Sequence, residues 1–147
     1  MSTDNKEEMG TKNHSLKYKF LVEIVGTFIL VYAICSAGTV YADRGQLGII
    51  GIGLVHALAL TAIVYAIGYR SGAQVNPAVT IGLLVAGKIK GKEAAVYIIA
   101  QLIGAVIAAA VVYSIFGSQM SASVTLPFED NVVRALILET VMTFTLV

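Results

Sequence analysis

The sequence predicts an all-α polytopic membrane protein. Hydrophobic residues make up 57% of the 147-residue chain and charged residues only 13%, whereas a soluble domain carries about 25% charged residues. The mean hydropathy of +0.82 and two long stretches without any acidic or basic residue indicate the same class. The net charge of +1 gives no indication of a nucleic-acid partner.

Three stretches are long enough to be membrane helices, which need about 20 apolar residues. The first contains a single charged residue, Glu23, and the other two contain none. We expect these three spans at residues 20–41, 47–69 and 94–116.

The two ends of the chain differ from these spans. Residues 1–19 are polar, and we expect them to form a disordered cytoplasmic tail. A fourth apolar stretch, residues 132–147, carries Glu139 and is still apolar at its last residue. We therefore interpret it as the truncated start of a further span, preceded by an extracellular loop at residues 117–131.

A shorter apolar segment lies between the second and third spans. It runs from residue 77 to residue 87, which is about 16 Å of helix, or half a membrane. If this segment returns to its starting side, eight of the ten Lys and Arg residues share the inner side, and only Arg44 and Arg134 lie outside. The positive-inside rule therefore favours a re-entrant half-helix and a cytoplasmic N-terminus.

Tyrosines are enriched where a membrane helix meets water, and most of the seven here lie near the ends of the expected spans. We expect an interfacial belt from five of them: Tyr18, Tyr41, Tyr69, Tyr97 and Tyr113. Tyr32 and Tyr65 lie further inside, and we expect them to be packing residues.

The first and fourth apolar stretches share a sequence pattern. Residues 23–31 and 139–147 both read E-x-V-x-T-F-x-L-V. Apolar helices can match by chance, but shared Glu, Thr and Phe positions favour a true internal repeat. Two full spans and one re-entrant segment separate the copies, so they run in opposite directions, which is an inverted repeat of the kind found in transport proteins.

The residues before the half-helix carry the strongest chemical signal. Asn76 is a favourable N-cap and Pro77 suits the first helical position, so a helix starts at membrane depth after non-helical backbone at 71–75. Such backbone is tolerated only where it is buried in protein or lines a water-filled cavity. The helix N-terminus and the Asn76 amide would donate hydrogen bonds to a neutral solute and repel cations. The alternative is an ordinary N-cap between two helices.

The stretch 71–80, Ser-Gly-Ala-Gln-Val-Asn-Pro-Ala-Val-Thr, resembles the first signature of the major intrinsic protein family, the aquaporins and glycerol facilitators. The sequences around Glu23, at 99–105 and around Glu139 resemble the first, third and fourth helices of that family. The resemblance covers nearly all of residues 21–147. It implies an aquaporin-like inverted repeat, with a first repeat of three spans and one half-helix at 20–116 and the start of the second at 132–147.

The resemblance also implies a role for each matching residue. Asn76 would be the pore donor of an asparagine-proline-alanine box completed by Pro77 and Ala78. The carbonyl groups of the preceding loop would form an acceptor ladder for single-file solute, contributed by Gly72, Ala73 and Gln74. The family usually has histidine at the position of Gln74, so a pH response tied to that histidine is in doubt here, although glutamine still donates and accepts.

Three further residues would support the pore loops of the two repeats. Glu23 would be a buried carboxylate that holds loop backbone, because acids inside a membrane are functional candidates by default. Glu139 would be its counterpart in the second repeat, and Gln101 would be a polar brace. The resemblance also implies a homotetramer of the full-length chain in the plasma membrane, with no cofactor and no metal.

His56 is a candidate wall residue of the pore. It lies 13 residues before Tyr69, about 20 Å along a core of about 30 Å, and so in the outer half of its span. Its spacing to Asn76 matches the constriction residue of the family, where water-selective members usually have Phe and glycerol facilitators Trp. Histidine resembles the plant tonoplast group, some of which also pass ammonia or urea. The alternative is a histidine hydrogen-bonded to a neighbouring helix.

The predicted function is a passive channel for water or a small neutral solute such as glycerol, ammonia or urea. An enzyme is the second class, for which His56 with Glu23 or Glu139 is the only visible pair, and no nucleophile is suitably spaced. A non-conducting interaction module or truncated half-channel is the third. A second asparagine-proline-alanine box followed by arginine after Val147 would establish the channel, and it would supply the wall residues that select the solute.

Overall fold

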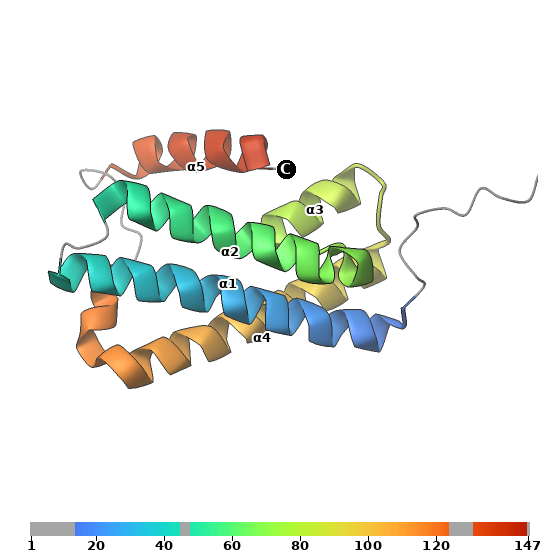
Figure 1. The fold of residues 1–147 in the computed structure, drawn as a ribbon. Helices are drawn as coiled ribbons and strands as arrows, with labels where there is room; N and C mark the ends of the chain where they lie inside the picture. The colour runs from blue at the N-terminus through green and yellow to red at the C-terminus, as the bar shows by residue number, and fades with distance from the viewer. Residues whose placement is uncertain (1–13, 45–47, 124–130, 147) are drawn as a thin grey trace, which may run out of the picture.

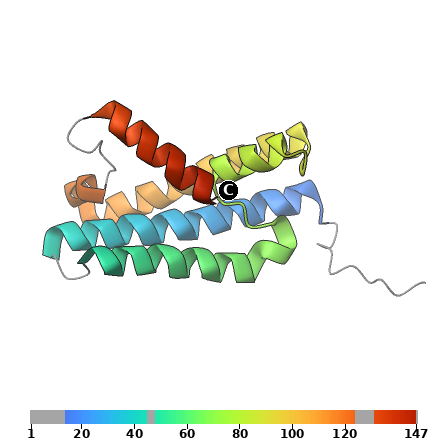
Figure 2. The same cartoon turned by 90° about the horizontal axis from the view of Figure 1, so that it is seen from above.

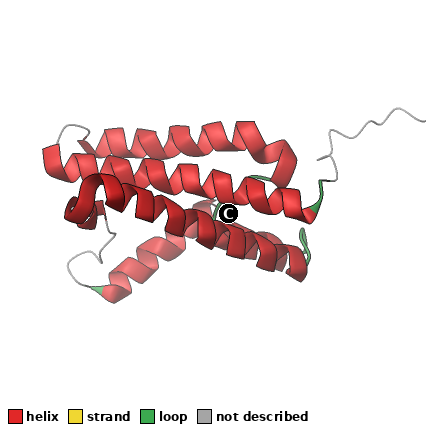
Figure 3. Ribbon diagram, turned by 90° about the horizontal axis from the view of Figure 1, so that it is seen from below, coloured by secondary structure: helices red, strands yellow, loops and turns green. Residues whose placement is uncertain are grey.

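The computed structural model describes residues 14–44, 48–123 and 131–146, and the regular secondary structure in these ranges is entirely helical (Figure 3). Residues 1–13 of the expected tail and 124–130 of the expected extracellular loop lie outside the described residues. The predicted all-α class is confirmed. Three of the described helices are long and apolar enough to cross a membrane.

These three helices are α1 (Leu16–Arg44), α2 (Gly48–Ser71) and α4 (Gly91–Phe116). α1 begins before the expected span because Ser15 caps it: the Ser15 Oγ accepts a hydrogen bond from the Tyr18 N–H at 3.3 Å. A criterion based on apolar residues alone misses such a polar first turn, and therefore it underestimates the length of the helix.

α1 occupies the centre of the bundle and packs against α2 on one side and α4 on the other (Figures 1 and 2). α1 and α4 approach closely at Gly104. A Cβ atom at this position would lie 2.5 Å from the carbonyl oxygen of Ile24 and 3.1 Å from the backbone nitrogen of Phe28. Glycine is therefore required for this contact, as is common where membrane helices cross closely.

The short helix α3 (Pro77–Val85) lies on a segment that enters the bundle and returns. The ammonium group of Lys19 in α1 donates to Glu93 in α4 at 2.8 Å, and the guanidinium group of Arg70 in α2 donates to the Tyr18 hydroxyl at 2.7 Å. These contacts place the end of α2 and the start of α4 at one end of the bundle (Figure 1). The segment that joins them therefore returns to its starting side, as predicted for a re-entrant half-helix.

α3 ends slightly before the predicted limit of residue 87 because a glycine terminates it. Gly87 adopts a φ of +68°. The Gly87 N–H donates to the Leu84 carbonyl at 3.0 Å, and the Lys88 N–H donates to the Leu83 carbonyl at 2.8 Å. This pair of bonds is a Schellman motif, which satisfies carbonyl groups that the last turn would otherwise leave unpaired.

Two elements follow α4. A 3₁₀-helix, η1 (Gly117–Ser123), occupies the first half of the expected loop and contacts α1 and α4. The last helix, α5 (Val132–Leu146), has no buried residue. α5 lies apart from the tightly packed helices (Figures 1 and 2), so most of its surface has no partner among the described residues.

One of the expectations for tyrosines is wrong. Tyr97 was expected at the membrane interface but is buried, with 1% of its surface exposed. Tyr65, which was expected to be a packing residue, is 83% exposed among the described residues, and its packing role stays a prediction. Position along a span indicates depth in the membrane, whereas burial depends on which face of the helix meets a neighbour.

Candidate functional site

The loop from Gly72 to Asn76 joins α2 to α3 with non-helical backbone. Gly72, Ala73 and Val75 have positive φ angles of 92°, 46° and 40°. A β-branched residue such as Val75 rarely adopts this region. Both Ala73 and Val75 are buried, so the surrounding structure must hold the loop in a conformation that it would not adopt alone.

Glu23 of α1 is the residue that holds the loop. Its side chain is fully buried, with an exposed fraction of 0%. Oε1 accepts hydrogen bonds from the Ser71 hydroxyl at 2.7 Å and the Gln74 N–H at 3.1 Å. Oε2 accepts from the Val75 N–H at 2.8 Å and the Gln101 amide at 2.9 Å. Four donors thus compensate the buried carboxylate for the loss of water.

A second set of hydrogen bonds connects this cluster to α3 and α4. The Tyr97 hydroxyl donates to the Ser71 carbonyl at 2.7 Å. The Gln101 amide nitrogen lies 3.0 Å from the hydroxyl oxygen of the fully buried Thr80. Gln101 therefore bridges Glu23 and Thr80, which links α1, α3 and α4 around the loop.

Sequence reasoning missed Tyr97 and Thr80 as members of this cluster. A signal for Tyr97 was present, because it precedes Gln101 by four residues and so lies on the same face of α4. Thr80 follows Asn76 by four residues in the same way. Its role depends on the position of α4, which the local sequence does not specify.

Asn76 caps α3 as predicted. Its backbone is extended, with φ −150° and ψ 124°, and its side-chain Oδ1 accepts a hydrogen bond from the Ala78 N–H at 2.8 Å. Pro77 occupies the first position of the helix. Because Oδ1 is engaged with the helix, the NH₂ group of the Asn76 amide is the end that can donate to another molecule.

A cavity of about 680 Å³ lies beside the loop. It is bounded by α1, α2, the loop and the start of α3, and Leu146 of α5 also lines it. Its lining is mainly apolar. The side chains in the lining that can form hydrogen bonds are those of His56, Gln74 and Asn76, so the cavity combines apolar walls with a few polar groups, as solute sites commonly do.

His56 lines this cavity from α2. Its Nδ1 lies 3.2 Å from the carbonyl oxygen of Ile52, one turn earlier in the same helix. Because a carbonyl oxygen can only accept, this hydrogen bond requires Nδ1 to carry the proton. The Nε2 atom of the neutral ring is then an acceptor. The hydrogen-bond partner of Nδ1 therefore belongs to α2 itself and not to a neighbouring helix.

The remaining predicted residues occupy different positions. Gly72 is exposed at the end of α2 and lies outside the cavity lining, as do Pro77 and Ala78. Ala73 and Gln74 do line the cavity. Glu139 is exposed on α5, and no described residue gives it a polar partner. Its expected role, which concerns a second loop, stays a prediction.

Gln74 differs from the other loop residues in its side chain. It is 5% exposed, and its side-chain Oε1 is buried without a hydrogen-bond partner among the described residues. The backbone N–H of Gln74 bonds to Glu23, so the main-chain support does not depend on the glutamine side chain. The expected bracing role of that side chain stays a prediction. The part of the chain that the structure describes contains no cluster of three or more potential metal ligands.

The fold and the site define a polytopic helical membrane protein with a re-entrant half-helix held by a buried carboxylate. The chain belongs to the major intrinsic protein family, whose family model matches residues 10–147.

Three relatives illustrate the range of similar proteins. The chain is 40% identical to Aquaporin Z from Rhodopseudomonas palustris over 115 residues, which cover 77% of this chain and 48% of the relative. It is 36% identical to Aquaporin NIP1-1 from Zea mays over 128 residues, or 86% and 45% of the two chains. It is 44% identical to Glycerol uptake facilitator protein-like 6 from Lactiplantibacillus plantarum over 108 residues, or 74% and 48%. The chain spans about half the length of the curated relatives that it matches.

Proposed function

We propose that the whole protein is a passive membrane channel for water or a small neutral solute. The observation that carries this proposal is the capped N-terminus of α3, whose Asn76 lines a mainly apolar cavity between the membrane helices. Membership of the major intrinsic protein family supports it. Because transport follows the gradient of the solute, the proposal requires no cofactor, metal or covalent chemistry.

The physical basis is the electrostatic field at the start of α3. The first N–H groups of a helix have no partner within it, and the helix dipole places about half a positive charge there. Together with the Asn76 NH₂ group, this end attracts the oxygen atom of a neutral solute and repels cations, including hydronium. The carbonyl groups of Gly72, Ala73 and Gln74 would then accept the hydrogen bonds that the solute donates.

In this proposal the described helices form the first of two repeats. Residues 20–116 would be the first repeat, 117–131 an extracellular loop and 132–147 the start of the second repeat. Glu139 would hold the second pore loop as Glu23 holds the first. The basic end of the bundle would face the cytoplasm together with the N-terminus, and the whole protein would be a plasma-membrane homotetramer with one pore in each subunit.

Osmotic shrinkage of vesicles tests this function. We expect proteoliposomes that contain the whole protein to shrink faster than empty vesicles after a hyperosmotic shift, as measured by stopped-flow light scattering. Isotopic uptake of glycerol, urea and ammonia analogues by the same vesicles would then rank the solutes. Equal shrinkage and uptake with and without the protein would contradict the channel and favour a non-conducting interaction module.

His56 provides a second prediction about the same pore. Replacing His56 with tryptophan adds a larger ring to the cavity lining, and we expect the water flux to fall by about tenfold or more because pore diameter limits conduction. The measurement is stopped-flow shrinkage, with ammonia flux recorded in parallel. The matched control is Leu58→Trp, since Leu58 lies on the same helix, is 66% exposed and does not line the cavity. Unchanged fluxes in His56→Trp would remove His56 from the pore wall.

A further inference from the structure

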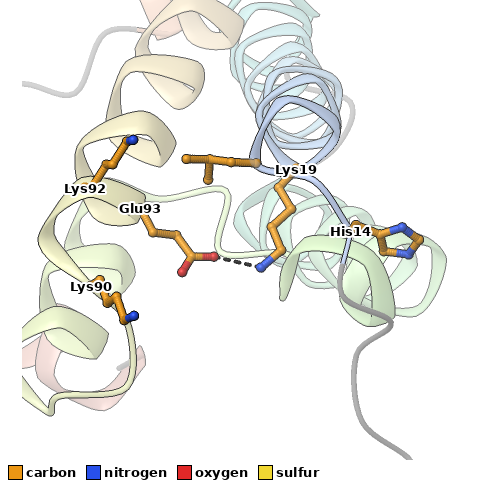
Figure 4. A pocket seen from close by; sticks show the side chains of 6 residues that line it. His14, Lys19, Lys90, Lys92 and Glu93 are labelled. Carbon is orange, nitrogen blue, oxygen red and sulfur yellow. Dashed lines mark hydrogen bonds and ion pairs between the residues drawn. The ribbon is translucent and has the colours of Figure 1, made fainter.

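A second, basic pocket lies at the end of the bundle where α1 and α4 begin. It has a volume of about 240 Å³ and is lined by His14, Leu16, Lys19, Lys90, Lys92 and Glu93. Figure 4 shows Lys19 bonded to Glu93, with Lys90 and Lys92 on either side of that carboxylate. None of these residues belongs to the cavity beside Asn76.

The charges in this pocket do not balance. The lining contains three lysines and one glutamate, and the Glu93 carboxylate is already paired with Lys19 at 2.8 Å. Lys90 and Lys92 are exposed and have no ion-pair partner among the described residues. Two positive charges therefore remain available for an anionic ligand.

The start of α4 adds hydrogen-bond donors at the same place. Lys90 is the N-cap residue but makes no side-chain capping bond. The first intrahelical donor is the Ala94 N–H, which bonds to the Lys90 carbonyl at 3.0 Å. The N–H groups of the preceding turn are therefore left for an external acceptor, and helix N-termini favour anions such as phosphate.

An apolar groove continues from the basic pocket. It is lined by Leu16, Lys17, Phe20 and Leu21 of α1 and by Val96 of α4, and Leu16 is common to both spaces. Leu21 is 61% exposed. The groove thus runs from a basic end toward the apolar outer surface of two membrane-spanning helices. A small soluble anion could occupy the basic pocket but would leave the groove empty. A lipid has a charged headgroup for the pocket and an apolar chain for the groove.

We propose that this pocket and groove bind an anionic phospholipid. The headgroup phosphate lies between Lys90, Lys92 and the first turn of α4, and an acyl chain lies along the groove between α1 and α4. Basic pockets between membrane helices at the membrane surface bind anionic headgroups in this way. The site is distinct from the proposed pore, so the proposal of a lipid site does not depend on which solute the whole protein conducts.

Native mass spectrometry of the purified chain in detergent tests the site, because it resolves individual bound lipids. The probes are dioleoylphosphatidylglycerol, which is anionic, and dioleoylphosphatidylcholine, which has no net charge. We expect tighter binding of the anionic lipid. Lys90→Gln and Lys92→Gln should each lower its affinity about fivefold, and the double variant roughly 25-fold, because each lysine near a membrane surface contributes about that factor.

Lys88→Gln is the matched control. It removes one lysine from the same end of the bundle, but Lys88 is exposed and does not line the pocket. We expect its affinity for the anionic lipid to change by less than about twofold, because Lys88 makes no contact in the pocket and an exposed charge is screened by salt. Far-ultraviolet circular dichroism should show the same helix content in all the variants.

Four outcomes would overturn the proposal. Equal affinity for the two lipids would mean that the apolar groove binds the acyl chain and that the basic pocket does not recognise the headgroup. An equal loss in Lys88→Gln would mean a diffuse surface attraction. Full displacement of the lipid by inorganic phosphate would assign the pocket to a small anion. Binding of the anionic lipid only after deletion of residues 1–13 would mean that this segment of the chain occupies the pocket.

Discussion

Replacing Glu23 with glutamine is expected to destabilise the protein by about 2–6 kcal/mol, the largest effect of any substitution proposed for the loop. Each carboxylate oxygen accepts two hydrogen bonds from buried donors. An amide keeps one of these oxygens and replaces the other with an NH₂ group. Because this group cannot accept hydrogen bonds, two buried donors lose their acceptor. Each buried donor without an acceptor costs about 1–3 kcal/mol. The measurement is equilibrium unfolding of the chain in mixed detergent micelles, followed by circular dichroism.

Glu93→Gln is the matched control for this substitution. Glu93 pairs with Lys19, but both side chains are partly exposed, with 26% and 20% of their surfaces accessible. Ion pairs of this kind contribute about 0–1 kcal/mol, so we expect only a small change in unfolding free energy. If Glu23→Gln proved as mild as the control, the carboxylate could not be the group that maintains the positive φ angles of the loop.

Gly104→Val is expected to have the second large effect, because it places a side chain where α1 and α4 are in backbone contact. Even the Cβ atom would lie 2.5 Å from the Ile24 carbonyl oxygen. Since backbone cannot move aside as a flexible side chain can, the two helices must separate. Overpacking a core costs about 1–3 kcal/mol, and separation of the helices would also lengthen the hydrogen bond from Gln101 to Glu23. The same unfolding experiment measures the loss.

Gly68→Ala is the control for the glycine prediction. Gly68 also lies within a membrane-spanning helix, but the nearest atom to an added Cβ is a methyl carbon of Val64 at 3.8 Å, an ordinary contact distance. We expect little loss of stability, since alanine is the better helix former. Equal destabilisation by both substitutions would indicate a general intolerance of side chains in the spans and would contradict a specific contact at Gly104.

The parts of the fold that could be predicted depend on local or additive properties. Asn76 and Pro77 specify a helix start through their own capping and φ preferences, so α3 was located from its first residues. Its re-entrant path was predicted from the number of basic residues on each side of the membrane. That number is obtained by adding up residues in the sequence and requires no knowledge of helix packing. Glu23 stood out because an acid in an apolar span is costly unless it is paired.

The parts that could not be predicted depend on how helices face one another. Tyr97 lies near the end of a span, which suggested the interface, but rotation of α4 turns it toward the Ser71 carbonyl. The positive φ of Val75 is unfavourable for its residue type, and a hydrogen bond to Glu23, 52 residues earlier in the chain, stabilises it. The basic pocket joins the starts of α1 and α4, Leu16 and Gly91, which are 75 residues apart in the sequence.

By itself, the sequence predicted a helical membrane protein, with three spans among the described residues, a half-helix capped by Asn76 and a buried acid at Glu23. Hydropathy, charge counts and capping preferences are properties of short segments, and they were sufficient for these conclusions. Only the tertiary structure decided which donors surround Glu23 and that His56 and Asn76 line one cavity. It also showed that an apolar groove adjoins lysines with no ion-pair partner among the described residues. These features arise from contacts between residues distant in the chain, and such contacts are set by the packing of whole helices.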